Sequence, residues 1–330
     1  MLTFAFRGLV IGLAAAILSG CGGQNGATAV PQGVAGQSRA HRMSGESWML
    51  PEASGEDLLY VGSFQYFSGN VVSVFSYPDG KLVGQLAVDA SELCSDSQGN
   101  VFVTQGSVRG DDSKILEYAH GGTQPIETLS DPYNGAYGCS VDPATENLAV
   151  ANTGHFESPG TVLVYPKASG TPTVYQFSYW TLYCAYNGNS DLFVTGNEQH
   201  RVGLRFPLAE LARGSTQFTR VKLKKKIYHP MGIQWDGTYL AAGDGTLTIN
   251  NARLRRYRIE GKRGILVSGI RPHVYGNSFF IQGSTVIIAD GVDTVWLLSY
   301  PGGSRESTIS LYSPLGVTVS VAPSRSRIRK

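Results

Sequence analysis

The chain has 330 residues, of which 42% are hydrophobic and only 16% are charged. This composition excludes a disordered chain, which would combine few apolar residues with a high net charge. The net charge of +2 conceals an asymmetry: residues 51–200 carry 4 Lys and Arg against 17 Asp and Glu, and residues 201–273 carry 15 against 4. The basic segment could meet a polyanion such as an acidic lipid or glycan, or its charges could lie on solvated outer strands.

The N-terminus has the pattern of a secretory signal. One cation, Arg7, precedes an apolar stretch over 9–18 that is too short for a comfortable membrane span. The residues Leu18-Ser19-Gly20-Cys21 resemble the lipobox of bacterial lipoproteins. The resemblance implies a signal peptide over 1–20, cleavage before Cys21 and acylation of Cys21, which anchors the chain to membrane lipid. An ordinary signal peptide with a chance cysteine is the alternative.

The resemblance implies that the protein is exported and lipid-anchored to the cell envelope. Gly22 occupies the position where an aspartate resembles an inner-membrane retention signal, which favours the outer membrane in a cell that has one. Residues 21–50 contain few large apolar side chains, so we expect a lipidated Cys followed by a flexible tether. Ordered structure should begin near Trp48 or Leu58, and the basic segment 324–330 should be a solvated tail.

An internal repeat indicates the fold. A short apolar triplet recurs six times, with spacings of 42, 47, 44, 47 and 47 residues between the central residues. The copies are Leu59-Tyr60-Val61, Val101-Phe102-Val103, Leu148-Ala149-Val150, Leu192-Phe193-Val194, Tyr239-Leu240-Ala241 and Val286-Ile287-Ile288. Triplets of this kind are typical of strands, and the 41 glycines and 17 tyrosines fit an all-β chain with many turns.

Other strands recur around the triplet. An innermost strand precedes it, a third strand follows it, and a more polar fourth strand comes last. The expected third strands are 72–75, 115–118, 162–165, 204–206, 254–257 and 295–298. Four short antiparallel strands at a period in the mid-forties are the signature of a propeller blade. We therefore predict an all-β fold, a six-bladed β-propeller of four-stranded antiparallel blades over residues 51–323.

The first repeat lacks an innermost strand, and the end of the chain supplies one. Residues 316–322 alternate as the innermost strands of the other repeats do. We expect this C-terminal strand to complete the first blade and to close the ring, which leaves no open edge between the first and last blades.

The repeat resembles the NHL and gluconolactonase-like six-bladed propellers, most clearly over 94–103 and 138–150. Gluconolactonase-like enzymes hold a divalent cation on the ring axis with a Glu, two Asn and an Asp. The resemblance thus implies one divalent cation as a candidate cofactor and nominates as metal ligands Glu92, Asn134, Asp236 and Asn277. The chain departs from the family because the first repeat has no Glu before its innermost strand, and the family's flanking motifs are missing.

Aromatic and imidazole side chains collect in the loops that lead into the innermost strands. These loops share one face of a propeller, near the central channel. The candidate ligand-binding residues there are Tyr137, Trp180, Tyr183, His229, His273 and Tyr275. Tyr and Trp suit sugars, peptides or lipid headgroups, but they could equally plug the channel. The histidines lack metal-ligand spacing, and Asp244 and Asp290 are expected to cap turns.

Three cysteines, Cys94, Cys139 and Cys184, are 45 residues apart and fall on successive innermost strands. At least one must stay unpaired. Small apolar packing between blades is the favoured interpretation, because neighbouring innermost strands seldom bring two Cβ atoms within about 4.5 Å.

No catalytic constellation accompanies the repeat, so the sequence favours a binding or scaffolding lipoprotein that is not an enzyme. An envelope protein or a glycan is its candidate partner, no specific nucleic-acid partner is expected, and the chain should be a monomer. The alternative is a metal-dependent lactonase-like hydrolase or lyase with its site at the channel mouth.

Overall fold

The computed structural model describes residues 46–64, 70–106, 113–133, 135–154, 159–200, 203–245 and 252–323, all within one compact unit, Gly45–Lys330. The predicted signal peptide, Cys21, most of the tether and the basic tail lie outside the described residues. Among the residues described, no helix is both long and apolar enough to span a membrane.

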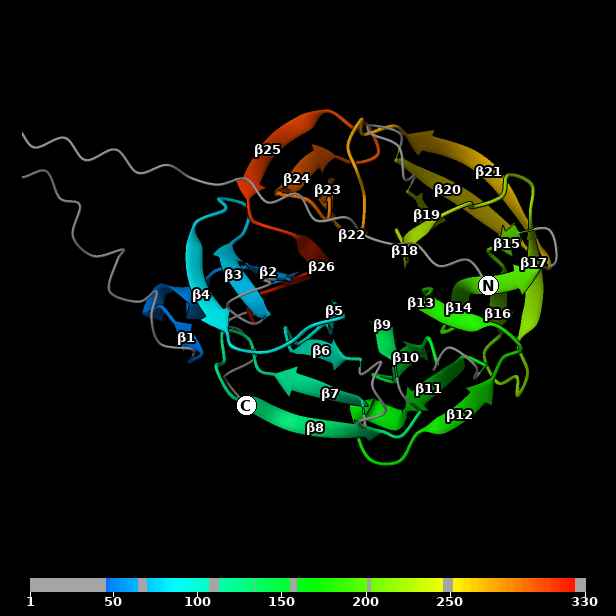
Figure 1. Ribbon diagram of the computed structural model, residues 1–330, viewed down its shortest axis with the longest axis horizontal. Helices are drawn as coiled ribbons and strands as arrows, with labels where there is room; N and C mark the ends of the chain where they lie inside the picture. Colours follow the sequence, from blue (N-terminus) through cyan, green and yellow to red (C-terminus); the bar gives the residue numbers. More distant parts are fainter. Residues whose placement is uncertain are drawn as a thin grey trace, which may run out of the picture. The chain divides into compact units, whose positions relative to one another are not determined.

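Strands make up most of the described chain, and their sheets lie around a central axis (Figure 1). Only two short 3-10 helices interrupt the described strands, η1 (Pro51–Gly55) and η2 (Pro166–Ala168). The first sheet has five strands in the order β1 (Trp48–Met49), β4 (Leu82–Leu86), β3 (Val71–Ser76), β2 (Leu58–Ser63) and β26 (Pro314–Ser320). Because β1 pairs with β4, the first sheet begins at Trp48, the earlier of the two starting points expected from the sequence.

Three further sheets have four antiparallel strands each, and in each the order in space follows the order in sequence. The second sheet has β5 (Glu92–Ser95), β6 (Val101–Gln105), β7 (Ser113–Tyr118) and β8 (Pro125–Asp131). The third has β9 (Ala136–Val141), β10 (Leu148–Asn152), β11 (Thr161–Tyr165) and β12 (Thr173–Gln176). The last has β22 (Ser278–Gln282), β23 (Thr285–Ala289), β24 (Thr294–Ser299) and β25 (Arg305–Ser310).

The remaining strands form a nine-stranded sheet with two antiparallel halves. One half contains β13 (Trp180–Tyr186), β14 (Leu192–His200), β16 (Leu208–Leu211) and β17 (Thr219–Leu223), with β15 (Gly203–Arg205) paired to the end of β14. The other contains β18 (Pro230–Trp235), β19 (Leu240–Asp244), β20 (Arg253–Glu260) and β21 (Arg263–Ile270). A parallel pairing of only two residues on each strand, between β17 and β21, joins the halves.

The apolar triplets lie on the second strands β2, β6, β10, β14, β19 and β23, with Tyr239 just outside β19. Continuous apolar runs form there because both faces of these strands are covered by neighbouring sheets: β2 and β10 are buried throughout, whereas the outer strand β8 is mostly exposed. One expected third strand, 204–206, is wrong. The chain folds back at the end of β14 as the short β15, and β16 takes the third position instead.

The end of the chain closes the ring, as predicted. The C-terminal strand β26 pairs antiparallel with β2, with Leu59 opposite Val319 and Val61 opposite Val317. The carboxylate of Asp57 accepts a hydrogen bond from the Ala322 amide at 2.8 Å, just beyond the strand. Residues more than 250 positions apart thus share one sheet. The strand runs from Pro314 to Ser320, so it begins and ends two residues earlier than predicted.

Candidate functional site

The innermost strands β5, β9, β13, β18, β22 and β26 surround the axis, and neighbours among them run side by side in the same direction. Two contacts between β5 and β26 show this: the Val317 amide donates to Glu92 at 3.3 Å, and further along both strands the Ser95 hydroxyl donates to the Val319 carbonyl at 2.8 Å. They enclose a cavity of about 580 Å³, named here the axial well.

The axial well opens at one end of the ring. Its exposed lining residues all belong to the turns that follow the innermost strands or to the segment just after β26: Ser97, Gln98, Pro143, Glu146, Gly188, Gly237 and Val321. Its lining residues nearest the beginnings of the strands, such as Glu92, Tyr183 and Ser278, are buried. The well is therefore open on the side opposite to the loops that the sequence nominated.

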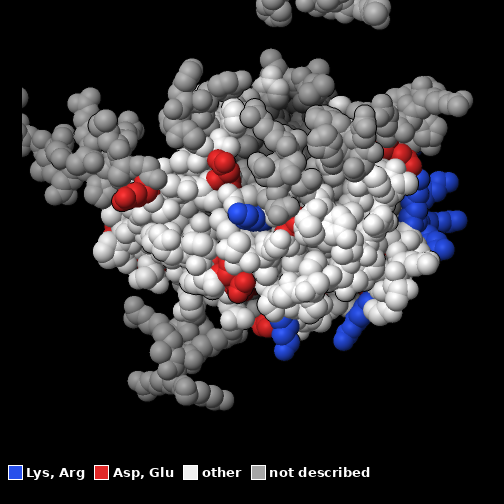
Figure 2. Space-filling model, turned by 60° about the horizontal axis from the view of Figure 1, so that its bottom comes forward, with Lys and Arg blue, Asp and Glu red and all other residues white. Residues whose placement is uncertain are grey.

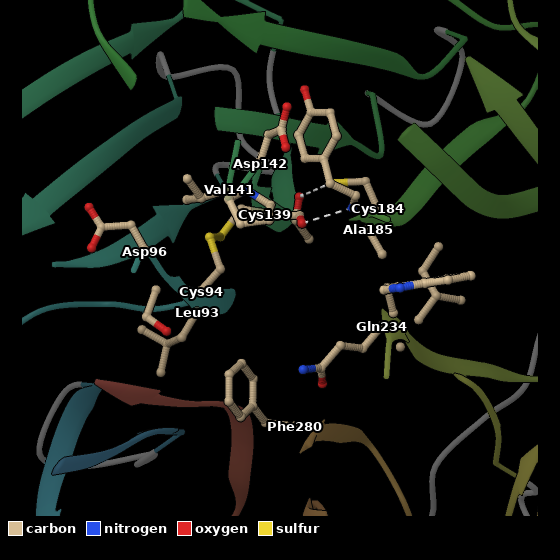
Figure 3. Close-up of a pocket in the computed structure, with 18 of the residues that line it drawn as sticks. Leu93, Cys94, Asp96, Cys139, Val141, Asp142, Cys184, Ala185, Gln234 and Phe280 are labelled. Carbon is tan, nitrogen blue, oxygen red and sulfur yellow. Dashed lines mark hydrogen bonds between the residues drawn. A yellow bond between two sulfur atoms is a disulfide. The ribbon is translucent and has the colours of Figure 1, made fainter. Parts of the chain in front are cut away.

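Aromatic and amide side chains line the wall of the well. The aromatic lining residues beyond Tyr183 are Tyr186, Trp235, Phe279 and Phe280, and Phe280 and Gln234 point toward the middle of the pocket in Figure 3. The Gln234 side chain also accepts from the Ile281 amide at 2.7 Å, so both ends of its amide bind the free edge of β22. An edge that would otherwise stay unpaired beside the axis is satisfied in this way.

The charge of the well is negative. Its described lining includes four carboxylates, Glu92, Asp96, Asp142 and Glu146, and no Lys, Arg or His. The carboxylate of Asp96 accepts from the backbone amides of Gln98 and Asn100, both at 2.8 Å, and Asp142 holds its own turn in a similar way. These turns fix the carboxylates at the mouth, where they favour cationic over anionic ligands.

Glu92 lies at the inner end of the well, on the first residue of β5. Its Oε1 accepts hydrogen bonds from the Ser278 hydroxyl at 2.9 Å and from the Val317 amide at 3.3 Å. Its Oε2 is buried and has no hydrogen-bond partner within the described ranges. Burial raises the pKa of Glu92 to about 7, because its hydrogen bonds only partly offset the loss of water around the charged form.

Two tyrosines that the sequence nominated lie beside Glu92. The rings of Tyr137 and Tyr183 meet edge to face with their centroids 5.3 Å apart, and the Tyr183 hydroxyl donates to the Asn277 carbonyl at 3.3 Å. Burial raises the pKa of both phenols. The structure thus brings together Glu92, Tyr137, Tyr183 and Asn277 as a layer across the inner end of the well. Tyr183 is 6% exposed, so it closes this end.

Apart from Tyr183, the nominated ligand-binding residues do not line the well. Trp180 is the half-buried first residue of β13. His229 precedes β18, its amide donates to Asp244 at 2.9 Å, and its ring lies 5.9 Å from that of Phe206. His273, exposed and with a positive φ of 54°, and the partly buried Tyr275 lie between β21 and β22. Asp290 accepts from the backbone amides of the turn that follows it, as predicted. Asp244 accepts instead from the amides of Tyr228 and His229, in the segment before β18.

The nominated metal ligands do not converge. Asp236 directly follows β18 at the open end, where its carboxylate accepts from Arg256 and Tyr300, both at 2.6 Å. Glu92 and Asn277 lie at the opposite end of the innermost strands, and Asn134 is outside the described residues. The described ranges contain no group of three or more His, Cys, Asp or Glu that could hold a metal ion. The residues present do not fit the axial cation site that the family resemblance implied.

The cysteines correct another prediction. Cys94 on β5 and Cys139 on β9 form a disulfide bond with Cα atoms 5.7 Å apart, and it lies at the wall of the well (Figure 3). Cys184 is free and buried, so one thiol stays unpaired, as expected. Its Sγ contacts the carbonyls of Gly138 and Ala149. Packing between neighbouring sheets therefore describes Cys184 but not the other two.

The sequence did not predict the well, because the nominated residues lie in the loops at the opposite end of the ring. The available signal was the set of residues near or in the turns after the innermost strands: Gln98, Asp142, Trp235 and Gln282 are polar or aromatic at positions where small turn residues would suffice. A turn residue that caps its own backbone looks the same in sequence whether or not a cavity lies beneath it.

No protein-family model matches the chain, and no curated protein matches its sequence. Solved structures do resemble it. One chain of a nidogen/laminin complex and a protein of unknown function from Bacteroides caccae each give a TM-score of 0.58 at 12% identity, over 81% of this chain and 99% of theirs. A protein named as a candidate 6-phosphogluconolactonase from Bacteroides fragilis gives 0.53 at 11% identity, over 82% of this chain and 99% of its own.

These likenesses, together with the sheets around the axis, define the class of the protein: it is an all-β chain with the β-propeller fold. Identities of this size show the fold alone. Because propellers carry many unrelated functions, the function has to be argued from the well and the surface of this chain.

Proposed function

We propose that the chain is an exported, lipid-anchored propeller that binds a small polar ligand, neutral or cationic, in its axial well. The observation that carries the proposal is the lining of the well, which has four carboxylates and no cationic side chain in its described part. A volume of about 580 Å³ lies in the range typical of small-molecule sites.

The chemistry of the wall supports a hydroxylated or aminated ligand. Aromatic faces such as Trp235 and Phe280 offer flat apolar contact, and the side-chain amides of Gln98 and Gln282 offer donors and acceptors near the mouth. A phosphate ester would find no guanidinium or ammonium group to hold it on this wall. This argues against a sugar phosphate as the ligand, although one structural neighbour is named for such a substrate.

Two features support export and anchoring. The residues Leu18-Ser19-Gly20-Cys21 supply the lipobox-like site, and acylation of Cys21 would bind the chain to the membrane. The disulfide between Cys94 and Cys139 fits the same address, because such bonds form and persist mainly in oxidising compartments. Mass spectrometry of the membrane fraction tests the anchor: acyl chains on Cys21 are expected, and an unmodified chain starting elsewhere would contradict it.

The blade count belongs to this proposal. We assign six blades, with the two halves of the nine-stranded sheet counted separately. Each half has its own four-stranded antiparallel order from the axis outward, and only the short parallel pairing of β17 with β21 joins them. Six blades also agree with the six apolar triplets of the sequence.

Titration calorimetry on the purified chain tests the ligand class, with spermidine and glucosamine as cationic probes, maltotriose as a neutral probe and glucose 6-phosphate as an anionic one. Saturable binding of a cationic or neutral probe is expected, with none of the sugar phosphate. Phe280→Ala should weaken binding roughly fivefold or more, since an aromatic contact is worth about 1 kcal/mol. Tyr312→Ala, at an exposed aromatic outside the well, is the control. Binding of glucose 6-phosphate alone, or of no probe, would overturn the proposal.

A metal-dependent lactonase is the second candidate. The four nominated ligands do not converge, but the buried Oε2 of Glu92 has no hydrogen-bond partner among the described residues, and this free carboxylate oxygen favours the candidate. Metal analysis of the purified chain and a lactone-hydrolysis assay separate the two candidates. Stoichiometric Ca²⁺, Mn²⁺ or Zn²⁺, with turnover that is lost in Glu92→Gln, would replace the binding proposal by this one.

A further inference from the structure

A dense basic surface lies on the outside of the ring, where β17 pairs with β21. Lys222 lies opposite Arg263 in this parallel pairing, and the Lys222 amide donates to the Lys262 carbonyl at 2.9 Å. The segment after β17 adds three lysines. We define the basic surface as Lys222, Lys224, Lys225, Lys226, Lys262 and Arg263. Figure 2 shows Lys and Arg side chains gathered at one edge of the molecule, on the side where Figure 1 places β17.

These six cations are exposed, and none takes part in the ion pairs found among the described residues. Like charges on facing residues of neighbouring strands repel each other and destabilise a sheet. A fold that only needed solvated outer strands would alternate the two signs, as the exposed Arg258 and Glu260 do on β20. The concentration of one sign therefore indicates a partner with the opposite charge.

The backbone beneath the lysine run is fixed to the sheet. The Tyr257 hydroxyl donates to the Lys225 carbonyl at 2.8 Å, and the Arg255 guanidinium donates to the Lys226 carbonyl at 3.3 Å. Arg255 is itself paired with the buried carboxylate of Asp244. The lysine side chains thus project from a preformed surface and need no folding step on binding.

An exposed aromatic residue completes the surface. Tyr228 follows the lysine run by two positions and is 61% exposed. Its backbone amide donates to Asp244 at 2.8 Å, which holds it beside the cations. Tyrosine with its apolar ring and polar hydroxyl suits the boundary between water and lipid, where basic side chains meet headgroup phosphates.

We propose that the basic surface, with Tyr228, binds the phosphate headgroups of an anionic membrane and turns this edge of the ring toward the lipid. The inference extends the proposed lipid anchor, which would keep the ring near that membrane. The roughly 25 residues between Cys21 and the first described residue could span up to about 80 Å when extended, so the tether permits this orientation. The carboxylates of Asp96, Asp142 and Glu146 in the well repel the same headgroups, so lipid and ligand would occupy different sites.

Vesicle co-sedimentation tests the proposal on the full chain carrying Cys21→Ser, which removes the acyl chains. Phosphatidylcholine vesicles with and without phosphatidylglycerol are compared. Binding should require phosphatidylglycerol and should fall as salt rises, because screening weakens it. The triple variant that replaces Lys222, Lys224 and Lys225 with Glu should bind about a hundredfold more weakly, because each lost cation weakens binding several-fold. The matched control reverses Lys114, Lys167 and Arg271, which are exposed cations outside the basic surface, to Glu with the same change in net charge.

The two triple variants share one N-terminus, so the difference between them reports the basic surface alone, and thermal melting confirms that both fold. Equal binding by both variants, or equal binding to vesicles without phosphatidylglycerol, would overturn the proposal. Retention on heparin that depends on the three lysines, without vesicle binding, would also overturn it and would point to an anionic glycan. Failure here leaves the acylation of Cys21 and the ligand of the well to be judged by their own measurements.

Discussion

Cys94 and Cys139 join two neighbouring sheets through a disulfide bond, and each of them pairs within its own sheet with the second strand. Cys94 lies opposite Phe102, the centre of its triplet, whereas Cys139 lies opposite Val150, one residue past the centre of its own. Side chains alternate between the two faces of a strand, so this offset turns the two sulfur atoms toward each other across the gap between the sheets.

Removal of this disulfide should lower the free energy of unfolding by about 2–4 kcal/mol, since the bond closes a loop of 45 residues that is open in the unfolded chain of the variant. The double variant Cys94→Ser, Cys139→Ser is compared with the native chain by urea denaturation, each with and without a reductant. Only the native chain should lose stability on reduction. Equal sensitivity of both proteins to the reductant would show that another thiol is involved.

The same register shows why the sequence could not choose the pair. Cys184 lies opposite Val194, one past the centre of its triplet, which is the register of Cys139. The side chains of Cys139 and Cys184 therefore point to the same face of their respective sheets, so their sulfur atoms cannot meet. The equal spacing of 45 residues hides this, because it counts along the chain and ignores that the turns before the triplets differ in length. Triplets and period predict strands and sheets. The face to which one side chain points depends on the length of the turn that sets the strand register, which the period does not report.

The candidate site was also predicted only in part from the sequence. The repeat placed Glu92, Tyr137 and Tyr183 near one end of the channel, and the structure brings them together there. The repeat could not predict that buried side chains fill that end of the channel and leave the opposite end open. Which end of a channel is filled depends on side chains from several repeats meeting at the axis, and each repeat alone carries no information on its partners.

Glu92 should make the stability of the protein depend on pH. Its folded pKa of about 7 lies above the ordinary value of 4.5, so the neutral form is favoured in the fold. The raised pKa of Glu92 contributes to the free energy of unfolding fully below about pH 4.5, and this contribution is lost as pH rises through 7. The total loss is roughly 3 kcal/mol for a shift of this size. The variant Glu92→Gln has no ionisable group at this position. Its free energy of unfolding, relative to that of the native chain, should therefore rise between these pH values when both proteins are denatured at a series of pH values.

Glu117→Gln is the matched control for that series. The pKa of Glu117 is also raised to about 7, by burial and then by Asp96 and Glu127, but Glu117 is only half-buried and solvent screens it. A smaller slope change is expected. If Glu92→Gln and the native chain kept a constant difference from about pH 4 to 8, the pKa of Glu92 would be the same in the folded and the unfolded chain.

Asp236 and Arg256 should be coupled strongly. The Asp236 side chain is fully buried, and burial alone would raise its pKa, but hydrogen bonds from Arg256, Tyr300 and two backbone amides outweigh burial and lower it. Asp236→Ala leaves the Arg256 charge without its partner and should cost about 3 kcal/mol near neutral pH. This loss should shrink as pH falls through the folded pKa of Asp236, because the native pair then weakens too. Glu260→Ala, in an exposed pair with Arg258, should change stability by less than about 0.5 kcal/mol.

Closure by β26 should stabilise every sheet, because the strand completes the first sheet and also contacts the innermost strand of the second. The Ser95 hydroxyl donates to the Val319 carbonyl at 2.8 Å, and Thr318 donates to Ser95 at 3.0 Å. Truncation after Ser313 should therefore lower the melting temperature of the whole domain and expose the edges of β2 and β5 to aggregation. Truncation after Pro323 keeps the strand and should melt like the native chain. Melting followed by circular dichroism distinguishes the two, and an unchanged transition in the shorter chain would mean that the ring is held without its last strand.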